Sequence, residues 1–169
     1  MTFILNRKFL KSSYHITDLK LCSIRLHDNS KFPWVILIPR INRKFLKSSH
    51  HITDLKLCSI RLNDNSKFPW LILIPKRNKI TDMRDLNSKD QIQLIKEIVF
   101  VSKIMKKLFK TSKLNVEKIG NIVPQLHIHI IARSKKDSTW PLSVWVVKGK
   151  TYSKLALKNL IEKLRKVLK

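Results

Sequence analysis

The chain has 169 residues, of which 36 are Lys or Arg and 11 are Asp or Glu, so its formal charge is +25, and its 43% hydrophobic residues suffice for one core. Two glycines, Gly120 and Gly149, cannot supply the clustered glycines of a Rossmann fingerprint or a P-loop. The two cysteines lack the spacing of a zinc site and indicate no disulfide framework, and no segment has the roughly 18 apolar residues of a membrane span.

The positive charge is dispersed along the chain. Lys and Arg form no Arg-rich tract and are not interleaved with aromatic residues as in an RNA-binding sheet. Nucleic acid is therefore a possible partner but not the favoured one. Residues 1–10 contain a short apolar run broken by Arg7 and Lys8, which is not typical of a signal peptide, so we expect a soluble cytoplasmic protein.

A nearly perfect tandem repeat fills the first 75 residues. Residues 6–39 recur as residues 42–75, and only three of these 34 aligned positions differ: Tyr14/His50, His27/Asn63 and Val35/Leu71. Two such similar copies indicate a duplication and not a solenoid. We therefore divide the chain into an N-terminal copy without separate function, residues 1–40, and a domain, residues 41–169. Chain connectivity favours the second copy in the domain's sheet, with the first copy as the alternative.

The elements of the expected domain follow in chain order. Strands at 55–62 and 70–74, joined by the turn residues 64–67, predict a hairpin. A capping box at 88–91 opens a helix that runs to about residue 110.

Strands are expected next at 114–117, at 126–132, where apolar and polar residues alternate, and at 143–147, where the signal is weak. A closing helix carries an apolar stripe of Leu157, Leu160, Ile161, Leu164 and Leu168. The order predicts an α+β fold with an antiparallel sheet and two helices.

The most informative stretch is residues 124–133. Because side chains alternate along a strand, Gln125, His127 and His129 share one face there, and the apolar residues between them point into the core. Two imidazoles on a rigid strand are a candidate catalytic pair. Two alternatives stay open: half-exposed histidines on an edge strand, or a His-x-His metal site, which needs a third ligand.

With these residues, the sequence resembles the histidine triad (HIT) family, whose signature is three histidines that alternate with apolar residues. Here the motif reads Gln125-Leu-His127-Ile-His129, with Gln in the first position. The similarity spans about residues 55–141 and includes the following further positions: Asp64, Ile74-Pro75-Lys76, Asn115, Gly120-Asn121, Val123 and Trp140-Pro141. It implies a HIT-like antiparallel sheet of about five strands with two helices, beside the duplicated hairpin.

The resemblance implies an enzyme, a nucleotide hydrolase or nucleotidyltransferase that acts at the α-phosphate without a metal or other cofactor. It places the nucleophile at His127, which would form a nucleotidyl-histidine intermediate, and a phosphate-binding histidine at His129. It further implies phosphate or leaving-group contacts at Asn115, Gly120 and Asn121 and a ribose contact at Asp64. A homodimer is implied as well.

Gln125 is the main departure from the family pattern. It cannot titrate, although it can still donate and accept hydrogen bonds. Asn121 replaces the Gln usual after the glycine, and Arg77-Asn78 stands where many members have a histidine that contacts phosphate. The alternatives to an enzyme are a nucleotide- or nucleic-acid-binding module without catalysis and a degraded product whose duplication impairs folding.

Overall fold

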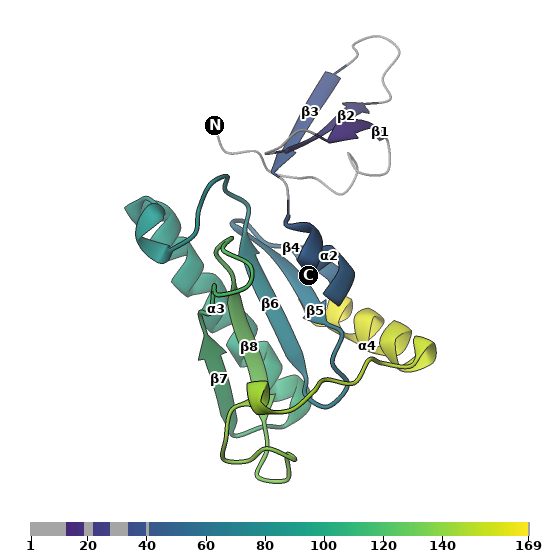
Figure 1. Ribbon diagram of the computed structural model, residues 1–169, viewed down its shortest axis with the longest axis vertical. Helices are drawn as coiled ribbons and strands as arrows, with labels where there is room; N and C mark the ends of the chain where they lie inside the picture. Colours follow the sequence, from purple (N-terminus) through teal and green to yellow (C-terminus); the bar gives the residue numbers. More distant parts are fainter. Residues whose placement is uncertain (1–12, 19–21, 28–33, 40, 169) are drawn as a thin grey trace.

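The computed structural model describes residues 13–18, 22–27, 34–39 and 41–168. Residues 41–168 form a five-stranded antiparallel sheet, flanked by helices (Figure 1). In spatial order its strands are β4 (Ser49–Asp54), β5 (Cys58–Asn63), β6 (Trp70–Pro75), β8 (Ile128–Arg133) and β7 (Lys113–Glu117). The predicted α+β fold and the number of strands in this sheet are confirmed.

Two hydrophobic clusters cover the two faces of this sheet. On one face, α3 (Ser88–Phe109) contacts β8 and α4 (Lys154–Val167) contacts β4, and the cluster there includes Ile128 and Ile130 of β8. On the other face, Phe45 from α2 (Arg43–Ser48) belongs to a smaller cluster that includes Trp70 and Ile72. The expectation of two helices is wrong, because residues 41–168 form a third α-helix, α2, beside α3 and α4.

The first strand of the domain and its first helix were both missed. The strand β4 contains a register shift between His51 and Thr53, which breaks the alternation that marks a strand in sequence. Each repeat is therefore a three-stranded meander and not a hairpin. The helix α2 is only six residues long and is rich in Lys and Arg, so it offers little periodic signal.

Other helix and strand boundaries differ from the predicted ones for local reasons. Asn87, one residue before the predicted capping box, is the N-cap of α3, because its side chain accepts from the Asp90 amide. Residues 143–147 are not a strand: Ser143 caps the 3₁₀-helix η2 (Val144–Val146). A second 3₁₀-helix, η1 (Met83–Asp85), precedes α3. No helix among the described residues is long and apolar enough to cross a membrane.

The first repeat forms a separate sheet of three strands. These are β1 (Ser13–Asp18), β2 (Cys22–His27) and β3 (Trp34–Pro39), and the pairs Ser13–His27 and Cys22–Pro39 repeat as Ser49–Asn63 and Cys58–Pro75. Of the two copies, the second one pairs with β8 through β6. Residues 1–12 of the first copy lie outside the described part of the chain. The division at residue 40 stays a proposal.

Candidate functional site

His129 is the second residue of β8, His127 immediately precedes this strand, and both are buried. His127 is 5% exposed and His129 is 4% exposed. The alternative of half-exposed histidines on an edge strand is wrong, because β8 lies between β6 and β7 and aromatic rings cover both imidazoles. The Phe45 ring meets His127 edge-on at a centroid distance of 4.7 Å, and Trp145 meets His129 at 5.2 Å.

The hydrogen bond of His127 defines its tautomer. Nδ1 lies 2.7 Å from the main-chain oxygen of Gln125, which can only accept, so Nδ1 carries the proton and Nε2 keeps its lone pair. Burial lowers the pKa of His127, and the charge of Lys118 lowers it further, against the opposing effect of the Gln125 carbonyl. Near neutral pH, His127 is therefore an uncharged imidazole with a free nitrogen lone pair.

His129 has the opposite tautomer. The indole Nε1–H of Trp70 donates to its Nδ1 over 3.0 Å, so the proton of the neutral ring lies on Nε2. Burial lowers the pKa of His129 to about 3, with a smaller contribution from His127. His129 can therefore donate one hydrogen bond from Nε2 without carrying a charge.

The two imidazoles lie side by side and open into a cavity. Their centroids are 4.7 Å apart and their planes are nearly perpendicular, at 89°. The cavity has a volume of about 640 Å³, and most of its wall is apolar. Its lining includes Lys44, Phe45, Asn63, Trp70, Asn121 and Trp145 beside the two histidines. A nucleophilic nitrogen and a hydrogen-bond donor thus face a pocket of the size of a small ligand.

Gln125, the first residue of the motif, precedes β8 and is not among the residues that line the cavity. Its side-chain Oε1 accepts the main-chain N–H of Asn42, the N-cap residue of α2, over 2.9 Å. The next residue, Leu126, donates its N–H to Ile80 and not to a neighbouring strand. Strand alternation therefore begins only at Ile128, and Gln125 connects the site to the start of α2.

The other predicted residues lie around the site at different distances from its cavity. Asn121 lines the cavity, whereas its neighbour Gly120 is not among the lining residues. Asn115 lies on β7 and donates from Nδ2 to Oε1 of Glu117 over 3.2 Å. Asp64 follows β5, where it accepts the Tyr152 N–H over 3.0 Å and lies 3.5 Å from Nε2 of His50. Neither Asn115 nor Asp64 lines the cavity, although Asn63 does.

Several site residues were missed by sequence reasoning. Phe45, Trp70 and Trp145 form the aromatic surroundings of the histidines. Only Trp70 had a usable signal, because it lies in a predicted strand of the sheet.

Arg77 does not face the cavity: it forms a bidentate ion pair with Asp90 at 2.7 and 2.8 Å, so its guanidinium connects the end of β6 to α3. Among the described residues, no three His, Cys, Asp or Glu side chains could together hold a metal ion.

Comparison with known protein families identifies the class of protein to which this fold and this histidine pair belong. The family model of the HIT domain matches residues 44–136. The chain therefore belongs to the histidine triad family.

Solved structures agree with this assignment. A histidine triad protein from Bradyrhizobium japonicum is 35% identical with a TM-score of 0.74, over 77% of this chain and 98% of that one. A histidine triad protein from Sinorhizobium meliloti is 32% identical with a TM-score of 0.73, and the match covers 76% of this chain and 96% of that one. A histidine triad protein from Marinobacter aquaeolei is 30% identical with a TM-score of 0.75, and the match covers 78% of this chain and 96% of that one. No curated protein matches the chain.

Proposed function

We propose that the protein is a nucleotide hydrolase or nucleotidyltransferase that acts at the α-phosphate through a nucleotidyl-histidine intermediate. The observation that carries this proposal is the pair of complementary tautomers. His127 presents a lone pair on Nε2, and 4.7 Å away, between ring centroids, His129 presents an Nε2–H. One ring can attack phosphorus while the other donates to a phosphate oxygen.

In the first half-reaction, Nε2 of His127 attacks the α-phosphorus. The N–P bond forms, the bond from phosphorus to the leaving group breaks, and the leaving group keeps the electron pair and takes a proton from water. The His127 ring becomes positively charged, and the Gln125 carbonyl that accepts from Nδ1 stabilises this charge. The uncharged His129 donates to the developing negative charge on the phosphoryl oxygens.

In the second half-reaction, water or an acceptor hydroxyl attacks the same phosphorus. The new O–P bond forms, the N–P bond breaks, its electron pair returns to His127 and the attacking group releases a proton to solvent. Water as acceptor gives hydrolysis, and another acceptor gives nucleotidyl transfer. None of these steps needs a metal or cofactor.

The remaining predicted residues complete this proposal. Asn121, on the cavity wall, would contact the phosphate or the leaving group, supported by Gly120 in the same loop and by Asn115 on β7. Asp64, beside the cavity residue Asn63, would bind the ribose hydroxyls. Gln125 orients His127 through its main-chain carbonyl, so the attack by His127 does not depend on a titratable side chain at position 125.

We also propose that the protein acts as a cytoplasmic homodimer. The helix α3 exposes Ile92, Ile95 and Val99, which lie on one side at helical spacing, and β7 is an open edge of the sheet. A second copy could cover both features. The thiol of Cys58 is free and buried, which fits a reducing compartment.

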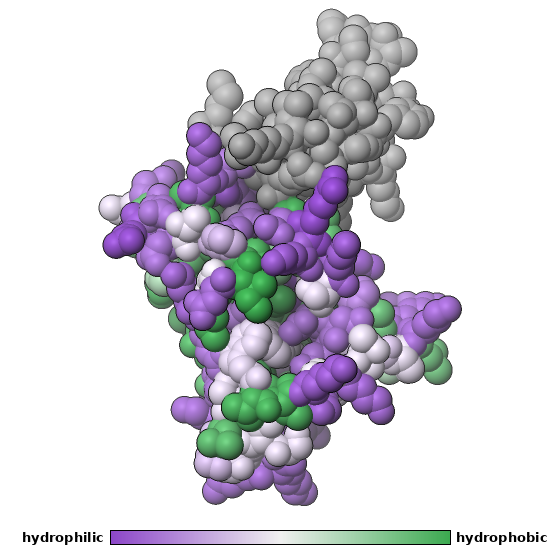
Figure 2. Space-filling view, in the orientation of Figure 1, coloured by the Kyte–Doolittle hydropathy of each residue, from purple (hydrophilic) through white to green (hydrophobic). Residues whose placement is uncertain are grey.

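The kinetic test uses adenosine 5′-phosphoramidate. We expect a burst of leaving group equal to the enzyme concentration when the second half-reaction is slower, and AMP as product. The alternative, a binding module without turnover, predicts no burst and strongly salt-dependent binding to random DNA. On the face in Figure 2, hydrophilic side chains are spread over the described part and do not form one stripe, which favours the small nucleotide.

A further inference from the structure

Large apolar side chains are exposed around the mouth of the cavity. Ile122 is 77% exposed and Trp145 is 48% exposed, although both line the cavity. Val146, the neighbour of Trp145 in η2, is 65% exposed, and Leu142, two residues before η2, is 62% exposed. We call these four residues the apolar rim. On the face in Figure 2, green side chains gather in the middle and in the lower part of the described region. Such a group of exposed apolar side chains is typical of an interaction surface.

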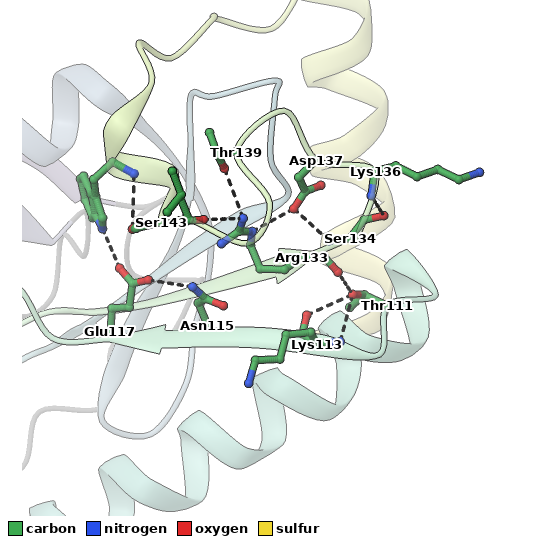
Figure 3. A network of polar contacts seen from close by, with 12 residues as sticks. Thr111, Lys113, Asn115, Glu117, Arg133, Ser134, Lys136, Asp137, Thr139 and Ser143 are labelled. Carbon is green, nitrogen blue, oxygen red and sulfur yellow. Dashed lines mark hydrogen bonds and ion pairs between the residues drawn. The ribbon is translucent and has the colours of Figure 1, made fainter.

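The segment that carries most of the apolar rim is fixed to the sheet (Figure 3). Arg133, at the end of β8 and only 2% exposed, donates to the Asp137 carboxylate over 2.8 Å and to the Leu142 carbonyl over 2.9 Å. Farther along the chain, the indole Nε1–H of Trp145 donates to Oε2 of Glu117 over 2.6 Å. Because these bonds hold the segment at both Leu142 and Trp145, its exposed apolar side chains are a fixed feature of the fold.

Lysines precede and follow this segment in the chain. Lys135 and Lys136 come before it, and Lys148 and Lys150 come after it. All four residues are exposed. The acidic residue between them is Asp137, whose carboxylate is paired with Arg133. The segment therefore presents positive charge beside its apolar side chains.

The helix α2, on another part of the cavity wall, shows the same combination. It exposes Leu46 beside Arg43, Lys44 and Lys47, and Lys44 itself lines the cavity. Within the described ranges, no carboxylate lies at ion-pair distance from these three cations. The mouth of the cavity is thus surrounded by apolar side chains and by positive charges that no acidic side chain offsets.

We propose that this face docks on the surface of an anionic phospholipid bilayer, with the apolar rim at the boundary between headgroups and acyl chains. Trp is enriched at that boundary, because its ring is apolar and its N–H is polar. Leucine, valine and isoleucine are stabilised by leaving water, and each lysine near the surface adds attraction to anionic headgroups.

A single-stranded nucleic acid also attracts lysines, but it binds to aromatic rings on which its bases stack. Three of the four residues of the apolar rim are aliphatic and offer no such ring. The composition of the rim therefore favours the bilayer over a nucleic acid.

Cosedimentation of the full chain with lipid vesicles measures the docking. We expect binding to phosphatidylcholine vesicles with about 30% phosphatidylglycerol and little binding to pure phosphatidylcholine, because the lysines need anionic headgroups. The double variant Leu142→Ser, Val146→Ser should lower the partition coefficient by about tenfold. The matched control is Leu155→Ser, Val167→Ser, which removes two exposed apolar side chains from α4 and should bind as the native chain does.

A second pair of variants tests the local charge. Lys135→Gln, Lys136→Gln should weaken binding to the anionic vesicles by about tenfold, as the loss of two charges near the surface predicts. Lys158→Gln, Lys163→Gln removes the same charge from α4 and should have a smaller effect. The proposal is wrong if the native chain does not bind the anionic vesicles, or if either α4 control loses as much binding as its rim counterpart.

Indole fluorescence identifies the face that docks. Brominated lipids should quench the native protein, and Trp145→Phe should lose a large part of this quenching. Trp70→Phe, which removes a buried indole, should lose little of it. Quenching that is unchanged in Trp145→Phe would place another face on the bilayer and would overturn the proposal.

Two further measurements address the other possible occupants of this face. Binding of polyuridylate, but not of vesicles, that depends on Leu142 and Val146 would identify a nucleic-acid surface. A change of sedimentation in the Leu142→Ser, Val146→Ser variant without vesicles would identify a contact between copies of the chain. Either result would overturn the proposal. None of these measurements requires turnover, so the proposal stands or fails independently of the proposed function.

Discussion

The indole Nε1–H of Trp70 donates to Nδ1 of His129 over 3.0 Å, and this bond determines which nitrogen of the imidazole faces the cavity with a proton. The bond crosses from β6 to β8, where Ile72 pairs with His129, so two neighbouring strands together define the chemical state of the ring. The histidine that we propose to bind phosphate is thus uncharged and is still a donor.

Replacing Trp70 by Phe should slow the reaction without unfolding the protein. Phe keeps most of the apolar contact but leaves Nδ1 of His129 without its donor, so the tautomer is no longer fixed. We expect kcat to fall by about tenfold, less than for outright loss of a donor to the transition state, and stability to fall by about 1 kcal/mol. Steady-state kinetics and urea unfolding measure the two effects, and unchanged kcat would contradict the role of this bond.

Stability should depend on pH through His129. Its pKa is about 3 in the folded protein and about 6.5 in the unfolded chain, so the unfolded state binds more protons between these values. The contribution is fully present above pH 6.5 and is lost as the pH falls toward 3. Between pH 6.5 and 4.5 the loss is about 2 kcal/mol. Urea unfolding of the native protein and of His129→Gln, which lacks this titration, should diverge by that amount; parallel curves would contradict the shift.

Replacing Gln125 by His should restore the family motif and leave turnover equal or higher, because the main-chain carbonyl that orients His127 is retained. The structure also predicts that this substitution lowers the stability of the fold. Oε1 of Gln125 accepts the Asn42 N–H at the start of α2, and we expect about 1 kcal/mol less stability without this bond. Thermal unfolding and kcat test both parts. A large loss of activity would show that the Gln side chain itself takes part in the reaction.

Deleting residues 6–41 should give a soluble, active domain. The deletion joins Leu5 to Asn42, so the N-cap of α2 and its bond to Gln125 remain. We expect less association than in the full chain, because β3 is an open edge in the sheet of the first copy. Sedimentation and thermal unfolding at matched concentrations compare the two chains. If the shorter chain fails to fold while the full chain stays monodisperse, the first copy is structural.

The same shortened chain retains Cys58 as its single cysteine. Burial raises the pKa of this thiol well above its usual value, and the charge of Glu97 adds to the effect. Ellman's reagent should therefore find no reactive thiol in the folded shortened chain and one after unfolding. A rapid reaction in the folded state would show that the second copy does not occupy its place in the sheet.

Sequence alone could predict four of the five strands of the sheet, the two long helices and the adjacent histidines, because each depends on a local period or spacing. It could not predict that the histidines are buried. Their cover comes from Phe45, 82 positions before His127, and from Trp145, which lies in a turn that resembles a strand in sequence. The bond between Gln125 and Asn42 was also out of reach, because these residues are 83 positions apart in the sequence and α2 was not predicted.

The most direct test of the proposed function is to trap the intermediate. The protein is mixed with adenosine 5′-phosphoramidate, quenched in alkali within the first turnover and analysed by peptide mass spectrometry. We predict an added AMP on the peptide that contains residues 125–133, with fragmentation placing it on His127, and no adduct in His127→Gln. Turnover without an adduct, or an adduct on His129, would contradict the assignment of His127 as the nucleophile.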